Sequence, residues 1–307
     1  MTTHTAQARG FCHEAFFHAG DDEFLAGAVP FLEAGISKGE AVIAALPEHR
    51  RELLRGALGP LAGEVALYPM EEIGRNPARL ISAWRCFLRS SADAPGVRGI
   101  GEPAHPGRSS AELEECERHE HLVNLMFREE RTLTVMCPYD TSALDDEVLA
   151  GAKRSHSHPG GPGRESAPEH FTLDGSLPQP DRPTLSLGFG RADLRTVRQA
   201  VASLARSVGL SSRRNEDFVL AACEAATNSI QHGGGEGSLA IWRDGEKLVC
   251  DIRDAGRITD PLVGRERPPV DQVGGRGLWI ANELCDLVQI RSGEQGTHVR
   301  LRMEIEG

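Results

Sequence analysis

The sequence lacks the long apolar segments and paired cysteines that mark membrane proteins and disulfide-stabilised proteins. No stretch approaches the roughly 20 consecutive apolar residues that a transmembrane helix needs, and the apolar run at 41–46 is predicted to be a short buried strand. The first residues, MTTHTAQARG, contain no apolar signal region. Seven cysteines are scattered without a C-x-x-C pair, which is typical of reduced thiols. We therefore expect a cytoplasmic protein without a membrane partner, in which each cysteine packs as a small core hydrophobe.

Positive charge is also in short supply. The 34 Lys and Arg residues are outnumbered by 45 Asp and Glu residues, which gives a formal net charge of −11. A nucleic-acid-binding surface needs a basic patch, so this balance argues against a nucleic-acid partner. The sequence has no G-x-x-x-x-G-K-[ST] loop either, so we expect no P-loop nucleotide hydrolysis in its first half.

What remains is an ordinary globular composition, with 39% hydrophobic and 26% charged residues. The length of 307 residues predicts about two domains of roughly 150 residues each. We place the domains at 1–150 and 184–307, with a flexible linker at 151–183 that is rich in Pro, Gly, Ser and His and has no helical or strand period. The linker histidines can bind metal adventitiously, but we favour solvated linker residues; they are His156, His158 and His170.

Helices and short apolar strands alternate through the first domain. Helices are predicted at 22–36, 48–58, 77–90 and 111–130, and strands at 41–46, 64–69, 97–103 and 132–140. This alternation predicts an α/β fold, a mostly parallel sheet with helices on both faces. Ligands of such sheets bind at the carboxyl ends of strands, where the sequence has 101–103 and 137–140.

Four segments of the first domain carry a family resemblance. They are FCHEAFFHAGDDEFL, GEAVIAAL, GEPAHPGRS with the following ELEECERHE helix, and CPYD. They resemble the MEDS sensory domain (methanogen/methylotroph sensory), a degenerate RecA-like fold. The resemblance implies an input module for a small-molecule ligand or a protein signal, with candidate pocket residues His13, His18, Glu102 and Tyr139. The alternative for each of these is a structural polar group or a helix cap.

Two further histidines of this domain, His119 and His121, lie in a stretch that superficially resembles the phosphoacceptor box of a histidine kinase. Such a box lies on a dimerising helical hairpin directly before an ATPase domain, whereas a strand and the linker intervene here. We therefore expect a charged helix surface. Glu115 and His119 also have the i,i+4 spacing of metal ligands, but two ligands alone make a weak site.

The second domain begins with a predicted strand at 184–189 and a helix at 192–209, whose apolar residues recur every three or four positions. A second helix is predicted at 216–232. Strands at 238–244 and 247–254, joined by a short turn at Gly245, predict a hairpin. A third helix is expected at 277–284, with a last strand after Thr297.

The helix at 216–232 carries the most informative residues of the chain. Asn228 follows Glu224 by four positions, so both side chains lie on one face, one turn apart, and His232 continues that face. An amide oxygen can ligate Mg²⁺, and a carboxylate one turn back can take a proton from an attacking hydroxyl or orient it. Two solvated polar residues on a helix face would give the same spacing, so the downstream motifs decide between the two interpretations.

Those motifs follow in a fixed order: Asp254-Ala-Gly256, then Gly274-Gly275-Arg276-Gly277 opening a helix, then Gly296-Thr297 before the last strand. The set resembles the Bergerat (GHKL) ATP-binding fold, an α/β sandwich shared by histidine kinases and gyrase. The sequences EAATNSIQHG, IRDAGR, GGRGLWIAN and GTHVRLRM are most similar to the anti-sigma factor serine/threonine kinases. The resemblance covers 184–307.

The resemblance implies a role for each motif residue. Asn228 would hold the Mg²⁺ that bridges the phosphates of ATP, and Glu224 would be the catalytic base or position the attacking hydroxyl. Asp254 would accept a hydrogen bond from the adenine amino group, and Gly256 would let the backbone approach the base. Thr297 would lie near the adenine-side water network.

At the phosphate end, Gly275 and Gly277 would offer backbone N–H groups at a helix start, where the helix dipole favours phosphate. The segment at 257–273, with three prolines and mixed charges, predicts a mobile lid over the nucleotide. The arginines that would reach the γ-phosphate, or else remain solvated lid charges, are Arg265, Arg267 and Arg276.

One position departs from the usual Asp-x-Gly-x-Gly pattern, because Ile258 stands where the second glycine is expected. Asp254 and Gly256 are the adenine-side pieces, so nucleotide binding is still expected. The missing second glycine puts the geometry of the lid in question, and kinase turnover depends on that geometry.

Together these features predict a signalling regulator that uses Mg²⁺ and ATP to phosphorylate a Ser or Thr hydroxyl on a partner. The resemblance implies a sigma factor or a STAS-type anti-anti-sigma protein as that partner, and a possible homodimer. Two alternatives remain open. One is an ATP-gated binding module without kinase activity, and the other is a histidine kinase relative that carries acid-labile phosphate on itself.

Overall fold

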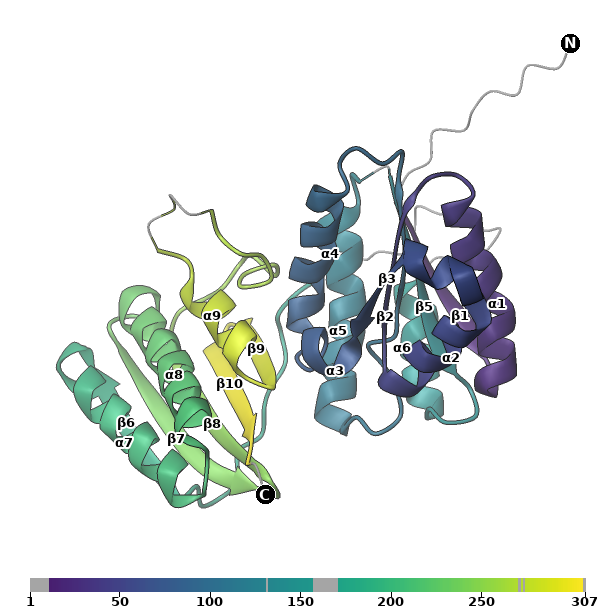
Figure 1. Ribbon diagram of the computed structural model, residues 1–307. Coiled ribbons are helices and arrows are strands. Elements are labelled where there is room, and N and C mark those ends of the chain that lie inside the picture. The colour runs from purple at the N-terminus through teal and green to yellow at the C-terminus, as the bar shows by residue number, and fades with distance from the viewer. Residues whose placement is uncertain (1–10, 131, 157–170, 270–271, 273, 306–307) are drawn as a thin grey trace, which may run out of the picture. The chain divides into compact units, whose positions relative to one another are not determined.

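The computed structural model describes residues 11–130, 132–156, 171–269, 272 and 274–305. The chain divides into two compact units, Met1–His170 and Phe171–Gly307. Each unit has its own five-stranded sheet (Figure 1). The division between them falls inside the segment 151–183 that the sequence predicts to be a linker.

The sheet of the first unit is entirely parallel, with the strand order β1-β5-β4-β2-β3. Its strands are β1 (Cys12–His18), β2 (Ala41–Leu46), β3 (Val65–Pro69), β4 (Val97–Gly101) and β5 (Leu133–Asp140). In β2 and β4 nearly every residue is buried, as expected for strands of a parallel sheet that is covered on both faces. The predicted parallel α/β fold is confirmed.

Helices cover both faces of this sheet. On one face lie α1 (Gly20–Ile36) and α2 (Glu48–Leu58), and on the other lie α4 (Ala78–Ser90), α5 (Ser110–Phe127) and α6 (Asp146–Ser155) (Figure 1). A 3₁₀ segment (Gly59–Glu64) and the short α3 (Met70–Ile73) connect them. Phe24 and Leu32 of α1 pack with Ile100 and Met136 of the sheet in one apolar core. On the opposite face the approach is close, because a Cβ added to Gly99 would come within 2.3 Å of the Trp84 indole.

The sequence predicts neither β1 nor α6. The strand β1 reads CHEAFFH, and its polar residues hide the apolar run by which the other strands are recognised. It lies at the edge of the sheet and pairs with β5 alone. The helix α6 falls partly in the glycine-rich stretch that reads as linker.

The expectation of a charged surface on α5 does not hold for three of its polar residues. Glu115, His119 and Glu120 are each at most 2% exposed and face inwards. The helix begins with a capping box between Ser109 and its N3 residue. One of its inward polar residues pairs with the sheet, since the Tyr139 hydroxyl donates to Glu120 Oε1 at 3.2 Å.

The second unit contains an antiparallel sheet in the order β6-β7-β8-β10-β9. The strands are β6 (Leu185–Gly190), β7 (Glu236–Asp244), β8 (Lys247–Asp254), β9 (Leu287–Gly293) and β10 (Gly296–Glu304). The predicted hairpin joins β7 to β8 through Gly245, which has a φ of 59°. β9 is a strand that the sequence does not predict.

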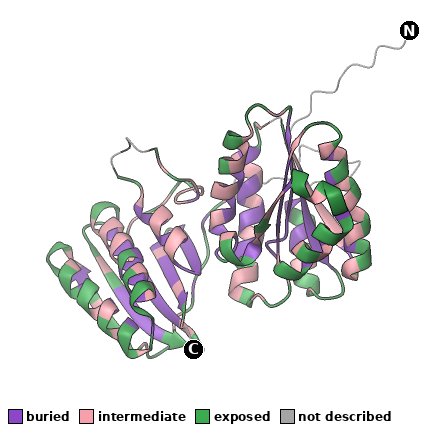
Figure 2. Cartoon of the chain, in the orientation of Figure 1, coloured by how far each residue is buried: buried purple, intermediate pink, exposed green. Residues whose placement is uncertain are grey.

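The helices of the second unit all lie on one face of its sheet. They are α7 (Leu194–Ser207), which follows a 3₁₀ turn (Arg191–Asp193), α8 (Ser212–His232) and α9 (Gly277–Leu284) (Figure 1). Buried residues gather between this layer and the sheet (Figure 2). In this apolar core Phe218 and Ala222 of α8 pack with Leu239 and Ile252. The unit is therefore a two-layer α/β sandwich, as predicted.

The segment 151–183 is not a linker throughout. Residues 151–155 complete α6, and the next residue, His156, is 1% exposed, so it is not solvated as expected. At the other end, Gln179 Nε2 donates to Asp251 Oδ2 at 2.8 Å, and Arg300 Nη2 donates to the Pro178 carbonyl at 2.8 Å. Both ends of the segment therefore pack on the units that they adjoin. His158 and His170 lie outside the described residues.

All seven cysteines are free thiols. Four are buried, as expected for small core residues: Cys116, Cys137, Cys250 and Cys285. Cys86 is exposed, and Cys12 and Cys223 are half-buried, so the expectation of a core position does not hold for these three.

Candidate functional site

The helix α8 presents Glu224 and Asn228 to the first residue of α9. A Cβ added to Gly277 would lie 2.9 Å from Glu224 Oε2 and 3.0 Å from Asn228 Nδ2. Such short distances leave no room for a side chain at Gly277. The predicted catalytic residue and the predicted Mg²⁺ ligand thus flank the start of α9.

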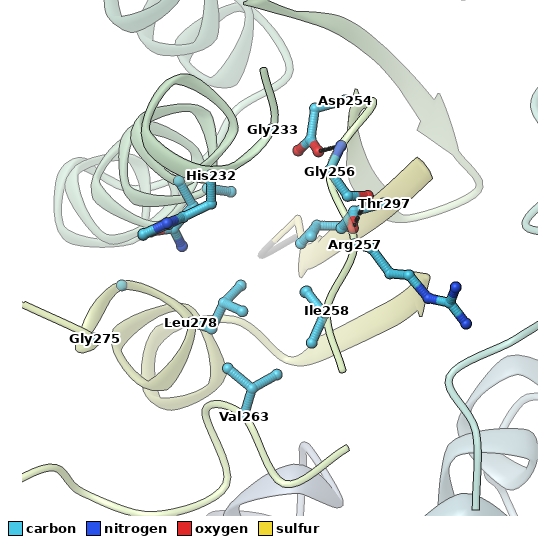
Figure 3. A pocket seen from close by; sticks show the side chains of 14 residues that line it. His232, Gly233, Asp254, Gly256, Arg257, Ile258, Val263, Gly275, Leu278 and Thr297 are labelled. Atoms are coloured by element: carbon cyan, nitrogen blue, oxygen red, sulfur yellow. Dashed lines mark hydrogen bonds between the residues drawn. The ribbon is translucent and has the colours of Figure 1, made fainter. Parts of the chain in front are cut away.

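A cavity of about 270 Å³ opens beside this contact (Figure 3). Every residue predicted to bind nucleotide lines it, except the three arginines Arg265, Arg267 and Arg276. The lining consists of Ala225, Asn228, His232, Gly233, Asp254, Gly256, Arg257, Ile258, Val263, Gly275, Gly277, Leu278, Thr297 and Val299. The motifs at 224–233, 254–258, 275–278 and 297–299 therefore meet around one space.

Glycines allow three chain segments to meet at Asp254. A Cβ on Gly233, at the end of α8, would lie 2.3 Å from Asp254 Cγ. A Cβ on Gly256 would lie 2.5 Å from the His232 carbonyl oxygen. Gly296, at the start of β10, has a φ of 99°, and its Cβ would lie 2.1 Å from the Asp254 carbonyl oxygen. These close contacts leave no space for a Cβ at the three positions, because the neighbouring atom is backbone at Gly256 and Gly296 and the Asp254 side chain at Gly233.

The carboxylate of Asp254 is held in place from two sides. The Ser229 hydroxyl donates to Oδ2 at 2.7 Å, and the Gly256 N–H donates to Oδ1 at 2.8 Å. An ionised carboxylate has about four acceptor positions, so these two bonds leave capacity for a further donor from the cavity. This is the property needed to receive an amino group of a ligand.

A chain of hydroxyl groups fixes the turn that follows Asp254. Thr297 Oγ1 donates to the Gly256 carbonyl at 2.9 Å and lies 2.8 Å from Ser292 Oγ. Because the hydroxyl proton of Thr297 is donated to the Gly256 carbonyl, the Ser292 hydroxyl is the donor in the hydrogen bond between Ser292 and Thr297. Ser292 in turn accepts the N–H of Ile258 at 2.8 Å. The residue in the place of the second glycine is therefore anchored by its backbone, with its side chain lining the cavity (Figure 3).

The start of α9 supplies the other wall. Gly274 and Gly275 have φ values of 85° and 75°, a backbone conformation that side-chain-bearing residues rarely adopt. They turn the chain into the N-cap residue Arg276 and the first helical residue Gly277. The guanidinium of Arg276 donates to the Pro269 carbonyl at 2.9 Å. Arg276 thus contacts the preceding segment and does not line the cavity.

Two family models match this chain. Residues 12–157 match the family described as MEDS: MEthanogen/methylotroph, DcmR Sensory domain. Residues 190–303 match the family described as Histidine kinase-like ATPase domain. The chain joins a MEDS domain to a histidine kinase-like ATPase domain.

The ATPase domain is also similar to a known kinase. The serine-protein kinase RsbW of Halalkalibacterium halodurans is 29% identical over 109 residues, which are 31% of this chain and 66% of that kinase. The chain therefore spans just under two thirds of this curated relative. A crystal structure of the RsbU and RsbW domains of Rv1364c from Mycobacterium tuberculosis shares 22% identity, with a TM-score of 0.28, over 40% of this chain and 33% of that one. In the described part of the chain, no helix is both long and apolar enough to cross a membrane.

The segment predicted to be a lid is described up to residue 269, and this part packs against α9 and the cavity. Asn282 Nδ2 of α9 donates to the Gly264 carbonyl at 2.9 Å, and Val263 lines the cavity. Arg265 is 3% exposed, so neither a solvated charge nor an exposed phosphate ligand describes it here. Arg267 lies over the Trp279 ring, with its guanidinium carbon 5.7 Å from the centroid.

The motifs did not reveal the apolar part of the cavity. Leu278 lies within the predicted GLWIAN motif, and Val263, Ile258 and Val299 flank the other motifs. In Figure 3 Leu278, Val263 and Ile258 face Asp254 across the cavity. Their sequence signal is weak, because apolar residues beside a glycine motif look the same as core residues. Ser229 was missed for a similar reason, since a serine inside a helix is common.

In the MEDS domain, the four candidate pocket residues fall into two groups on opposite faces of the sheet. His18 ends β1 and packs against Phe24 of α1, with ring centroids 5.5 Å apart. His13 and Tyr139 lie on the other face, next to Glu120 of α5. They therefore do not form one pocket.

Glu102 and His18 lie at the carboxyl ends of β4 and β1, near a buried arginine. Arg50 Nη2 pairs with Asp140 Oδ2 at 2.7 Å, and Arg50 Nη1 pairs with Asp21 Oδ1 at 2.7 Å. Burial raises the pKa of Glu102 to about 8, although Arg50 acts against this shift. Burial also lowers the pKa of His18. This edge of the sheet is where ligands of parallel sheets bind.

Proposed function

We propose that the ATPase domain binds ATP with Mg²⁺ and transfers its γ-phosphoryl group to a Ser or Thr hydroxyl of a partner protein. The observation that carries this proposal is the single cavity around which the four sequence motifs meet, with Glu224 and Asn228 at its helical edge. A volume of about 270 Å³ is near the lower limit of ligand pockets, roughly 300 Å³. It suits the adenosine part of a nucleotide, with the phosphates extending over the start of α9.

Each residue then has a task that its surroundings support. Asp254, held by Ser229 and Gly256, receives the adenine amino group. Asn228 supplies an amide oxygen for Mg²⁺, the ion that neutralises phosphate charge when it is bound. Glu224, one turn earlier and beside Gly277, orients the attacking hydroxyl and takes its proton.

The partner we propose is a STAS-type anti-anti-sigma protein or a sigma factor, with the MEDS domain as the input module. Similarity to a serine-protein kinase supports the reaction class. The match to a sensory domain family supports an input role for residues 12–157. A small ligand at the carboxyl edge of the parallel sheet, near Glu102 and Arg50, is the input we expect there.

The test is phosphate transfer from labelled ATP to purified STAS-domain proteins. General base catalysis contributes roughly 10²–10⁴-fold, so Glu224→Gln should lower transfer by at least about 100-fold while ATP binding is kept. The matched control is Glu216→Gln, an exposed glutamate on the same helix, which should transfer at the wild-type rate. Equal transfer by wild type and Glu224→Gln on a true substrate would contradict the proposed mechanism.

A second candidate function, an ATP-gated binding module without kinase activity, is supported by one residue. Ile258 replaces the expected glycine, and its side chain occupies the cavity wall between Asp254 and the lid. If this residue prevents the lid from closing productively, the domain acts as an ATP-gated binding module. That function predicts ATP binding and ATP-dependent partner capture without phosphate on the partner. Ile258→Gly should then create or raise phosphate transfer.

The histidine kinase alternative has little support. Of its two candidate phosphoacceptors on α5, His119 is 2% exposed and packs against the parallel sheet of the MEDS domain, and His121 is half-buried. A phosphoryl donor needs access to the ring nitrogen that it modifies. Acid-labile phosphate on the purified protein would nevertheless restore this alternative.

A further inference from the structure

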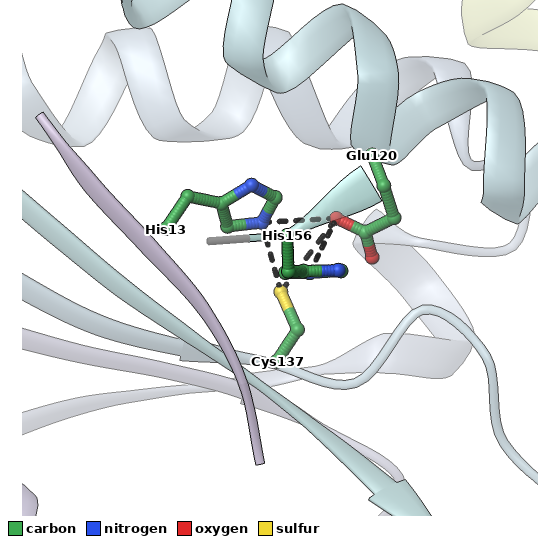
Figure 4. Close-up of side chains that lie close together, drawn as sticks. All are labelled: His13, Glu120, Cys137 and His156. Carbon is green, nitrogen blue, oxygen red and sulfur yellow. Dashed lines mark hydrogen bonds and ion pairs between the residues drawn. The ribbon is translucent and has the colours of Figure 1, made fainter. Parts of the chain in front are cut away.

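Four side chains that can ligate a metal converge inside the MEDS domain. They are His13 of β1, Glu120 of α5, Cys137 of β5 and His156, the residue after α6 (Figure 4). Each is at most 3% exposed. Their ligating atoms all lie within 4.8 Å of one another.

The spacing of these atoms fits a tetrahedral site. Zn²⁺ lies about 2.0–2.1 Å from nitrogen and about 2.3 Å from sulfur, so the edges of its ligand tetrahedron measure roughly 3.3–3.6 Å. His13 Nε2 lies 3.0 Å from Glu120 Oε2 and 3.3 Å from Cys137 Sγ. Glu120 Oε2 lies 3.5 Å from His156 Nε2 and 3.7 Å from Cys137 Sγ. These four distances bracket the tetrahedral edges.

Both imidazoles are held in the tautomer that leaves Nε2 free to ligate. His156 Nδ1 lies 2.8 Å from the Ala152 carbonyl, which can only accept, so Nδ1 carries the proton. His13 Nδ1 lies 2.9 Å from Asn124 Oδ1. The orientation of Asn124 is fixed because its Nδ2 donates to the Ser155 carbonyl at 2.5 Å. Metal-binding histidines are typically oriented in this way, by an acceptor at the other ring nitrogen.

The carboxylate is oriented as well. Tyr139 donates its hydroxyl to Glu120 Oε1 at 3.2 Å, which leaves Oε2 facing the two imidazoles and the thiol. Among the described residues, His156 Nε2 has no hydrogen-bond partner although it is buried. A buried nitrogen lone pair that faces a carboxylate oxygen is destabilising unless something positive lies between them.

Protons placed on His13, Glu120 and Cys137 satisfy this group only in part. The Cys137 thiol has one proton, and a single proton shared by His13 and Glu120 leaves the His156 Nε2 lone pair unsatisfied. A divalent cation satisfies all four atoms. Two neutral imidazoles, a carboxylate and a thiolate carry two negative charges together, so the occupied site is neutral and suited to a core.

We propose that His13, Glu120, Cys137 and His156 form a closed tetrahedral Zn²⁺ site that ties α5 and the end of α6 to the β1 and β5 strands. Imidazole and thiolate ligands favour zinc among the common divalent ions. With four protein ligands the site has no open position, which is typical of structural zinc. On binding, the Cys137 S–H bond breaks and the zinc–sulfur bond forms, and both the thiol proton and the proton shared by His13 and Glu120 leave to the buffer.

The test is metal analysis of the full chain, purified without a histidine tag, followed by replacement with Co²⁺. About one zinc per chain is expected, and Co²⁺ should produce a thiolate-to-cobalt charge-transfer band in the near ultraviolet. The matched pair of variants is Cys137→Ala and Cys116→Ala, two thiols buried in the same domain. The band should be lost in Cys137→Ala and kept in Cys116→Ala.

A third variant keeps the test decisive if Cys137→Ala does not fold. His156 lies just beyond the last turn of α6, so His156→Gln disturbs little of the fold. It should weaken Co²⁺ binding by at least tenfold, with far-ultraviolet circular dichroism unchanged. Absence of metal and of any cobalt band in the wild type would overturn the proposal. So would a band of equal intensity in Cys137→Ala, because the thiolate would then come from elsewhere.

Discussion

The two domains place their polar side chains in opposite ways. In the ATPase domain, Asn228 and Asp254 line an open cavity with Glu224 beside its Gly277 wall, and glycines bring the backbone close to it. In the MEDS domain, acidic residues and histidines are turned into the core, where each needs a partner or a changed protonation state. An open site of the first kind is built to receive a ligand and release it. Buried groups of the second kind contribute to the stability of the domain and make it depend on pH and ions.

The largest expected effect tests the buried charges of the MEDS domain. Glu102 has a folded pKa of about 8 against 4.5 for the free group, so between these values the folded chain keeps a proton that the unfolded chain has lost. The free energy of unfolding should therefore fall as pH rises from about 5 to 8. At about 1.4 kcal/mol per pKa unit, the loss amounts to a few kcal/mol. Glu102→Gln should remove it.

Unfolding of the MEDS domain can be followed by the fluorescence of Trp84 once the other two tryptophans, Trp242 and Trp279, are replaced by Phe. Urea unfolding at several pH values would then compare Glu102→Gln with Glu129→Gln, an exposed control. The charges that face Glu102 are Arg50, Asp140 and Asp21. The same pH slope in both variants would mean that Glu102 is ionised in the folded domain, and the contrast between the two domains would weaken.

The next largest expected effect is on ATP binding in the cavity of the ATPase domain. Gly256→Ala should weaken ATP binding by about ten- to a hundredfold, because its Cβ would lie 2.5 Å from the His232 carbonyl oxygen, and overpacking typically costs about 1–3 kcal/mol. Gly188→Ala is the matched control, since its Cβ would find no atom nearer than 4.0 Å. Calorimetric titration with ATP measures both. Unchanged ATP affinity in Gly256→Ala would mean that ATP does not bind in this cavity.

The smallest expected effect concerns a residue that orients Asp254 without lining the cavity itself. Ser229→Ala removes the hydroxyl that holds Asp254 Oδ2 at 2.7 Å, and one such bond contributes about 1 kcal/mol. ATP affinity should fall by up to about fivefold. Ser207→Ala, which removes an exposed hydroxyl at the end of α7, should leave affinity unchanged. A loss in both variants would point to general destabilisation of the domain.

The contrast between the domains also explains what the sequence could predict. The residues of the proposed ATP site lie in short motifs, where helical spacing and glycine turns determine which side chains meet. The pattern Glu224 to Asn228 therefore predicted a shared helix face, and Gly277 was correctly expected to begin α9. The alternation of helices and apolar strands predicted the parallel sheet of the MEDS domain in the same local way.

What the sequence did not predict depends on contacts between distant segments. β1 is polar for a strand, because His13 meets Glu120 and Cys137 in the folded core. His156 looked like a solvated linker residue, since nothing nearby in the sequence indicates that α6 carries it into that core. The buried face of α5 was mistaken for a charged surface for the same reason. Topology, and not spacing, brings these groups together.

The central claim is that the cavity beside α8 and α9 binds ATP through Mg²⁺ at Asn228. Thermal-shift titration with Mg²⁺ and ATP, on wild type, Asn228→Ala and the exposed control Gln231→Ala, tests it most directly. At a ligand concentration of about 100 times Kd, binding should stabilise the folded domain by roughly 2.7 kcal/mol, which raises Tm by about 2–8 °C. The account predicts a Mg²⁺-dependent rise in wild type and Gln231→Ala that Asn228→Ala loses. No rise in wild type, or an equal rise in Asn228→Ala, would contradict it.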